Sequence, residues 1–236
     1  MARCLIVSDI HANYAALRVV LAEPHDVLIC LGDIVGYGPH PAACVRELRD
    51  RFAVAIQGNH DRALTDGQPP RCRAQFRWLA DATAPIGREQ VLHHELEWLR
   101  ALPAWEWMVL DHMRFLGVHA TPSDPLYRYL GPDPKAWARE VTGIDVDALL
   151  VGHTHVQFDI RAGATRVVNP GSVGQPKDGD PRAAYAVIEN GGVSLHRVEY
   201  DVAETVAALR ASGADPTAVA QLVELLRTGG GPGPSP

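Results

Sequence analysis

Five short apolar runs, each followed at once by polar residues, constrain the fold of this 236-residue chain more than any other feature. The first three lie at residues 4–7, 27–31 and 54–56, and helical patterns over 14–22 and 41–51 separate them. Short apolar runs rich in branched side chains predict buried strands. A strand–helix–strand–helix–strand order is typical of a parallel sheet with crossover helices. The first third of the chain therefore predicts an α/β fold.

Hairpins dominate the prediction for the rest of the chain. The paired runs are 108–110 with 113–118, 156–160 with 165–168, and 183–188 with 193–198, and a further short strand covers 148–151. The turn signals between paired runs favour antiparallel pairing, so we expect the second half to be largely antiparallel.

Helices are expected at 71–102, 133–141, 203–210 and 217–227. Pro85 and Gly87 should split the first of these in two, and Asp133 should cap the second. Apolar residues at helical spacing in the first helical region are expected in the core: Trp78, Leu79, Leu92, Leu96 and Leu99. We expect one domain over residues 1–227 and a disordered Gly/Pro-rich tail over 228–236.

Composition narrows the function classes. The net charge of −6 argues against a general nucleic-acid binder, which normally carries a basic face. No apolar run reaches the roughly 20 residues of a membrane span, and Ser8 and Asp9 interrupt the N-terminal run too early for a signal peptide. The four cysteines show no CxxC spacing, and Cys4 and Cys30 fit buried core positions. We therefore expect a cytoplasmic protein.

Eight polar residues stand just beyond the predicted strands, where ligands of open α/β sheets bind. They are Asp9, His11, Asp33, Asn59, His60, His119, His153 and His155. Carboxylates, an amide and imidazoles without a thiolate suit manganese, iron, zinc or cobalt. The donors exceed what one ion takes, and a carboxylate can bridge two ions about 3.5–4 Å apart. The alternative to a shared metal site is a set of unrelated polar residues at the ends of the strands. The pair His153 and His155 would lie on the same side only if the backbone between them is extended.

The motifs Asp9-x-His11, Gly32-Asp33, Gly58-Asn59-His60-Asp61, His119 and Gly152-His153-Thr154-His155 resemble those of the calcineurin-like metallophosphoesterase superfamily. The loop at 169–174 is similar to that of the small prokaryotic phosphodiesterase branch, and the resemblance covers residues 1–198. It implies a four-layer αββα sandwich, with two mixed β-sheets packed face to face and helices outside. It also implies that Asp9, His11, Asp33 and His155 hold one metal, and that Asp33, Asn59, His119 and His153 hold the other. His60 would lie beside the metals without ligating them.

The chain departs from the protein serine/threonine phosphatases of this superfamily, which carry Gly-Asp-x-Val-Asp-Arg-Gly and Arg-Gly-Asn-His-Glu. Gly36 and Tyr37 replace the Asp-Arg pair, Gln57 replaces the second arginine, and Asp61 replaces the glutamate. These changes argue against protein phosphatase activity. Arg62 either replaces a lost arginine in part or is a solvated surface charge.

The resulting hypothesis is a metal-dependent phosphoesterase that hydrolyses small phosphodiesters or phosphomonoesters by attack of a metal-bridging hydroxide. Its catalytic residues would be His60, as general acid, with Asp33 and Asn59. Manganese is the first expectation for both ions, with iron, zinc, nickel or cobalt as alternatives. Substrate contacts are assigned to Arg62, Tyr37 and Asn13, although a helix cap is the favoured role of Asn13.

Two alternative functions stay open, a non-catalytic metal-binding scaffold of the same fold and a phosphatase on macromolecular substrates. The expected partner is a small phosphorylated substrate rather than a membrane or nucleic acid. The aromatic helical insert gives the chain a candidate homodimer face.

Overall fold

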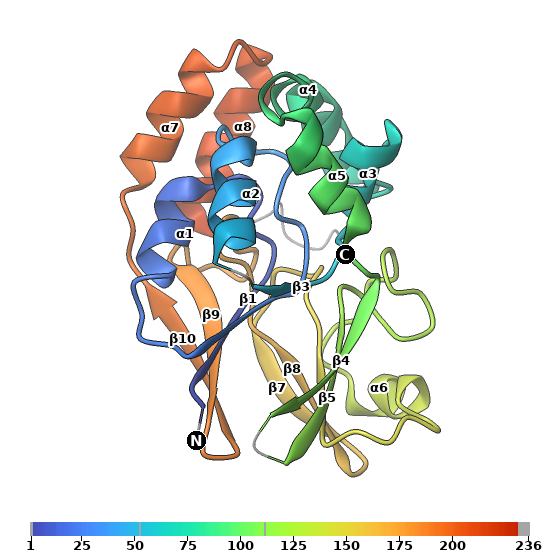
Figure 1. The fold of residues 1–236 in the computed structure, drawn as a ribbon. Coiled ribbons are helices and arrows are strands. Elements are labelled where there is room, and N and C mark those ends of the chain that lie inside the picture. Colours follow the sequence, from blue (N-terminus) through green and yellow to red (C-terminus); the bar gives the residue numbers. More distant parts are fainter. Residues whose placement is uncertain (1, 52, 111, 231–236) are drawn as a thin grey trace.

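The computed structural model describes residues 2–51, 53–110 and 112–230 and contains two five-stranded sheets (Figure 1). The first sheet has the order β10-β9-β1-β2-β3, with β1 (Cys4–Val7), β2 (Val27–Cys30), β3 (Val54–Ala55), β9 (Ala183–Glu189) and β10 (Gly192–Val198). The second has the order β4-β5-β6-β8-β7, with β4 (Trp105–Leu110), β5 (Met113–Val118), β6 (Ala148–Leu150), β7 (Phe158–Ala162) and β8 (Thr165–Asn169).

Strand pairing in the first sheet confirms the parallel prediction, because β1 pairs parallel to β2, and β2 parallel to β3. All three predicted hairpins are also present. The expectation of a largely antiparallel second half is wrong in part, since β6 pairs parallel to both β5 and β8. Both sheets are therefore mixed. The long connection between β5 and β6 allows this parallel pairing, which a hairpin cannot provide.

Apolar clusters define four layers. Ile6 and Ile29 of the first sheet meet Phe115 and Leu150 of the second, which packs the sheets face to face. The outer face of the first sheet is covered by α1 (Tyr14–Val20), α2 (Pro41–Asp50) and α5 (His93–Ala101). Trp137 of α6 (Pro134–Glu140) packs on the outer face of the second. Figure 1 shows α6 on the side of the second sheet, away from the other helices. The predicted αββα sandwich is confirmed.

The helical insert differs from its prediction. A helix that was not predicted, α3 (Asn59–Asp66), comes first, and α4 (Ala74–Gln90) then runs straight through Pro85. The break before α5 falls at Val91 and Leu92 instead. Proline removes one hydrogen bond to a carbonyl four residues earlier, and that residue, Asp81, is exposed, so water can replace the bond.

The predicted core residues of this insert divide into two groups. Leu79 and Leu99 are buried, and Leu96 is half-buried. Trp78 and Leu92 are 45% and 52% exposed, so their assignment to the core is wrong. Trp78 precedes the buried Leu79 in the sequence, but its side chain faces solvent because α4 buries only one of its faces.

The C-terminal helices α7 (Val202–Ala211) and α8 (Pro216–Thr228) pack against α4 through a separate apolar cluster. Thr228 is thus the last residue of α8 rather than the first of a tail, and Gly229 ends the helix with a left-handed backbone. Residues 231–236 of the predicted tail lie outside the described residues. None of the helices within the described ranges has the length and apolar character needed to cross a membrane. Cys4 and Cys30 are buried in the core as predicted.

Candidate metal centre

Seven donor side chains converge from the ends of strands in both sheets. Asp9 and His11 follow β1, Asp33 follows β2, Asn59 follows β3, His119 follows β5, and His153 and His155 follow β6. None of the seven is more than 3% exposed. Buried polar groups are costly without partners, so each of these side chains needs a partner inside the protein.

Main-chain hydrogen bonds tie these loops together. The backbone N–H of Asp9 donates to the carbonyl of Gly32 at 3.0 Å, and that of His11 donates to the carbonyl of Asp33 at 2.9 Å. Within the second sheet, the N–H of Gly152 after β6 donates to the carbonyl of His119 after β5 at 2.8 Å. These main-chain hydrogen bonds fix the loops, and the loops in turn place the donor side chains.

The donor loops use a left-handed backbone that ordinary residues rarely adopt. The φ angle is 52° at Asp9, 46° at His11 and 53° at Asp33. It is 65° at His153 and 62° at His155, so the backbone there is not extended, and the condition for the two side chains to lie on one side is not met. Their rings instead join different groups of donors. Such strain typically gathers at functional sites, where the surrounding structure enforces it.

Two glycines make room for the centre. A Cβ atom on Gly58 would lie 2.2 Å from both the backbone nitrogen and Oδ1 of Asp33. A Cβ atom on Gly152 would lie 2.0 Å from Oγ of Ser8 and 2.9 Å from Oδ2 of Asp9. Neither position can carry a side chain while the carboxylates stay in place.

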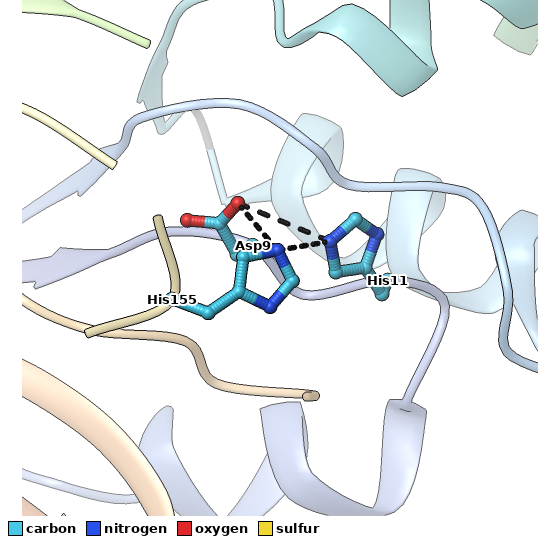
Figure 2. A group of neighbouring side chains, drawn as sticks. All are labelled: Asp9, His11 and His155. Atoms are coloured by element: carbon cyan, nitrogen blue, oxygen red, sulfur yellow. Dashed lines mark hydrogen bonds and ion pairs between the residues drawn. The ribbon is translucent and has the colours of Figure 1, made fainter. Parts of the chain in front are cut away.

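Cluster one consists of Asp9, His11 and His155 (Figure 2). Nε2 of His11 lies 3.0 Å from Nε2 of His155, and Nε2 of His155 lies 3.3 Å from Oδ1 of Asp9. The other carboxylate oxygen of Asp9, Oδ2, accepts hydrogen bonds from Oγ of Ser8 at 2.7 Å and from the N–H of His153 at 3.0 Å. Oδ1 thus faces the two imidazoles.

Cluster two consists of Asp33, His119 and His153. Nε2 of His119 lies 3.4 Å from Oδ2 of Asp33 and 3.2 Å from Nδ1 of His153. Oδ1 of Asn59 adds a further oxygen, 3.1 Å from Nε2 of His119, and its amide nitrogen donates to the carbonyl of Pro70. The amide orientation therefore presents an oxygen to this cluster.

Asp33 belongs to cluster two and also lies close to cluster one. Its Oδ2 is 3.7 Å from Nε2 of His11 in cluster one and 3.4 Å from Nε2 of His119 in cluster two. Its Oδ1 accepts the backbone N–H of His60 at 2.8 Å, at the start of α3. This geometry suits a carboxylate shared by two neighbouring cation sites.

The protonation pattern of cluster one fits a cation. Nδ1 of His11 lies 3.2 Å from the carbonyl of Val35, and Nδ1 of His155 lies 2.6 Å from that of Gln175. Since a carbonyl only accepts, each Nδ1 donates, and the neutral ring keeps a lone pair on Nε2. Burial lowers the pKa of both rings well below the usual value. Among the described residues, Oδ1 of Asp9 has no hydrogen-bond partner. Two ring nitrogens without a proton and a carboxylate oxygen without a hydrogen-bond partner are donors that could hold a positive ion.

His60 lies next to both clusters and a cavity of about 320 Å³. Its ring is 6% exposed and contacts the rings of His11 and Tyr37 at centroid distances of 5.0 and 4.6 Å. A Cβ atom on Gly36 would lie 2.5 Å from Nδ1 of His60, so the ring depends on that glycine. His60, His11 and Asp33 also offer atoms close enough to bind one ion, so geometry allows His60 a ligand role besides the predicted one.

The three predicted substrate contacts have different surroundings. Tyr37 lies in the cavity wall beside His60. Arg62 points along the surface of α3, where it lies 3.7 Å from Asp66, and this supports the solvated-charge interpretation rather than a substrate contact. Asn13 is the N-cap of α1, accepting from the N–H of Ala16, and its amide donates to the carbonyl of Gly174. The substrate role of Asn13 is corrected to the favoured cap role, because its polar atoms are already engaged.

Positions that depart from the phosphatase pattern have structural partners. The side chain of Gln57 donates to the carbonyl of Leu99, away from the donor clusters. The carboxylate of Asp61 accepts three backbone N–H groups, from Ile34, Val35 and Gly58. Asp61 thus fastens the loop that carries Asp33 to the start of α3, and this long-range cap explains why the helix begins at Asn59.

Three cations near the centre were missed by the sequence analysis. Nζ of Lys177 lies 3.4 Å from Nε2 of His155 and 4.1 Å from the ring centre of Phe76. Burial lowers the pKa of Lys177 to about 8. The guanidinium of Arg73 lies over Tyr129, whose ring packs against that of His153 with a centroid distance of 3.9 Å and a tilt of 33°, and Arg71 lies over Tyr127. The chain has only two lysines, and one of them follows the loop at 169–174, which was the available signal.

Comparison with known proteins places this geometry in a family. Residues 2–191 match the calcineurin-like phosphoesterase superfamily domain. The crystal structure of a metallophosphoesterase from Sphaerobacter thermophilus is similar, with a TM-score of 0.80 and 34% identity, covering 96% of this chain and 99% of that one. An uncharacterized protein of Methanocaldococcus jannaschii is 30% identical over 220 residues, which are 84% of this chain and 87% of that protein.

A phosphodiesterase is also among the relatives. Phosphodiesterase YfcE of Escherichia coli is 24% identical over 209 residues, which are 83% of this chain and 91% of that protein. The resemblance drawn from the strand-end motifs is confirmed by the domain match, which covers most of the described chain. This protein belongs to the calcineurin-like phosphoesterase superfamily.

Proposed function

We propose that this protein is a metal-dependent phosphoesterase that hydrolyses small phosphodiesters or phosphomonoesters. One observation carries the proposal: two buried donor clusters meet at Asp33, and in cluster one neutral imidazole lone pairs face an unsatisfied oxygen of Asp9. A scaffold without metal would gain nothing from such an arrangement, because buried groups of this kind cost free energy when unpaired. The phosphodiesterase among the relatives supports the same activity.

The donor set divides between two cations. Asp9, His11, Asp33 and His155 would hold the first, and Asp33, Asn59, His119 and His153 would hold the second. Divalent ions bound there would neutralise phosphate oxygens and make water more acidic, which supplies a nucleophile at neutral pH. Oxygen and imidazole donors suit manganese, which stays our first expectation, with iron, zinc, nickel or cobalt as alternatives.

The remaining residues would orient the substrate and handle the proton. Lys177, whose Nζ lies 3.4 Å from Nε2 of His155, would add a positive charge beside cluster one. His60 would protonate the departing oxygen, a contribution worth roughly 10²–10⁴ in rate. Burial lowers the pKa of His60 to about 4, so the ring is neutral until an anion enters the cavity and favours its charged form.

A small substrate fits the space and charge around the centre better than a macromolecule. The adjoining cavity of about 320 Å³ is at the lower end of the range of small-molecule sites. The net charge of −6 provides no broad basic face for nucleic acid. The homodimer and the cytoplasmic location stay predictions.

The test is hydrolysis of bis-p-nitrophenyl phosphate by the full chain after chelation and after reloading with manganese. We expect activity to be lost on chelation and regained on reloading, with about two metal equivalents per chain by elemental analysis. Metal uptake without turnover on diesters or monoesters would instead support the non-catalytic scaffold. Turnover that survives complete chelation would contradict the proposal.

A further inference from the structure

The cavity beside His60 is built from small apolar residues. Its walls come from the loop at 35–38, from α3 and from α4, and they include Val35, Ala63, Leu64, Ala80 and Ala84. Alanine and glycine leave the volume of about 320 Å³ open where larger side chains on the same helices would fill it.

The polar side chains of this cavity differ in their surroundings. His60 and Tyr37 form the end next to the metal centre, and the exposed residues Gln68, Asp81 and Arg88 form the end open to solvent. The buried hydroxyl of Thr83, which also lines the cavity, already donates to the carbonyl of Leu79 at 2.9 Å. The lining therefore offers an incoming group more apolar contact than hydrogen bonds.

We infer, on the basis of the proposed function, that this cavity receives the leaving group of the substrate and selects an aromatic, mainly apolar alcohol. Hydrolysis adds water across one P–O bond: the oxygen of water stays on phosphorus, and the departing alcohol takes a proton. His60 would give that proton, so the departing group must lie on the His60 side of the centre. The cavity is the space that adjoins His60 there.

Size and polarity select the chemical class. An apolar cavity of about 150 Å³ can hold benzene, so twice that volume accommodates a two-ring aromatic group. A sugar or glycerol in the same place would lose water from several hydroxyls without finding partners, at roughly 1–3 kcal/mol for each unpaired group. Aromatic rings gain from apolar contact and from the neighbouring ring of Tyr37.

The experiment measures binding of the alcohol and hydrolysis of its ester separately. Binding of 2-naphthol to the manganese-loaded full chain is followed by its fluorescence, and KM is measured for 2-naphthyl phosphate and for glycerol phosphate. Two variants narrow the cavity from opposite walls, Ala84→Leu on α4 and Ala63→Leu on α3. Ala207→Leu is the matched control, because Ala207 is exposed in the middle of α7.

We expect each narrowing variant to weaken 2-naphthol binding and to raise the KM for 2-naphthyl phosphate about tenfold or more, a factor equal to about 1.4 kcal/mol. The KM for glycerol phosphate should rise less, and Ala207→Leu should match the unchanged chain. In the unchanged chain, 2-naphthol should inhibit competitively while glycerol does not, a result that stands even if a variant fails to fold.

Two results would overturn the inference. One is 2-naphthol binding that is equal in the unchanged chain and in the narrowing variants, and the other is the absence of competitive inhibition by 2-naphthol in an active enzyme. The outcome in which 2-naphthol binds and both variants weaken it, while no ester is hydrolysed, would refute the proposed function and leave the cavity assignment intact. The two failures are thus distinguishable.

Discussion

Without an ion, the two donor clusters differ in how the charges of their carboxylates are compensated. In cluster two, burial lowers the pKa of His119, but the charge and hydrogen bond of Asp33, the charge of Asp9 and the carbonyl of Leu31 together raise that pKa to about 9. The proton on His119 then compensates the charge of Asp33. In cluster one, burial keeps the rings of His11 and His155 neutral, and Oδ1 of Asp9 has no hydrogen-bond partner among the described residues.

This difference shows that the two sites are unequal although they share Asp33. A cation entering cluster one would meet two neutral rings and Oδ1 of Asp9, which has no hydrogen-bond partner among the described residues, whereas a cation entering cluster two would have to displace a proton from His119. We therefore expect the first equivalent of metal to bind in cluster one, and the variants below separate the two sites in order of expected effect.

The largest effect is expected from Asp33→Asn compared with Asp9→Asn. The carboxylate of Asp33 lies near ring nitrogens of both clusters and that of Asp9 near ring nitrogens of cluster one only, so Asp33→Asn should remove both metal equivalents and Asp9→Asn only one. Loss of activity should exceed the roughly 10–100-fold typical of removing an outer partner of a metal ligand. Elemental analysis and diesterase assays measure both quantities. Equal metal loss in the two variants would remove the distinction between the clusters.

His60→Ala should lower turnover by about 10²–10⁴ on an ester with a poor leaving group, with little change on p-nitrophenyl esters, because only a poor leaving group needs the proton. Metal content should stay at the level of the unchanged chain. A fall in metal content would show that His60 completes a third donor group with His11 and Asp33, which the distances also allow.

Ser8→Ala should weaken metal binding in cluster one alone, by roughly 10–100-fold. The hydroxyl of Ser8 donates to Oδ2 of Asp9 at 2.7 Å and thereby orients Oδ1 toward His11 and His155. Metal titration by calorimetry should show one weakened phase and one unchanged phase. Ser194→Ala is the control, since the exposed Ser194 contacts His196 on β10. Weakening of both phases would mean that the clusters respond as one unit.

The smallest effect is expected from Asn13→Ala, which removes the cap of α1 behind cluster one. The free energy of unfolding should fall by about 1 kcal/mol, the usual cost of losing a helix cap, and the KM should not change. Urea denaturation and steady-state kinetics measure the two quantities. An increased KM at full stability would restore the substrate contact that the structure assigns instead to capping.

Local sequence patterns were sufficient for most of the framework. Each of the strand ends carrying Asp9, Asp33, Asn59, His119 and His153 could be located because a short apolar run stops there. The parallel first sheet followed from its alternation with helices. Neither inference needs knowledge of contacts between distant residues.

The features that were missed depend on distant contacts. The start of α3 at Asn59 relies on Asp61 binding backbone groups of Ile34 and Val35. The continuation of α4 through Pro85 relies on one face of the helix being solvated. Lys177 contacts His155 only once the loop after β8 folds back over the centre. A local pattern carries no information on any of these.

The left-handed backbone at Asp9, His11, Asp33, His153 and His155 has a consequence for protein engineering. If only these side chains were placed at the strand ends of another scaffold, they would point in other directions. The negative φ angles usual at such positions orient the Cα–Cβ bond differently. A designer would have to copy the main-chain path, including the absent side chains at Gly58 and Gly152. The geometry of this centre thus depends on its backbone torsion angles as much as on the identities of its residues.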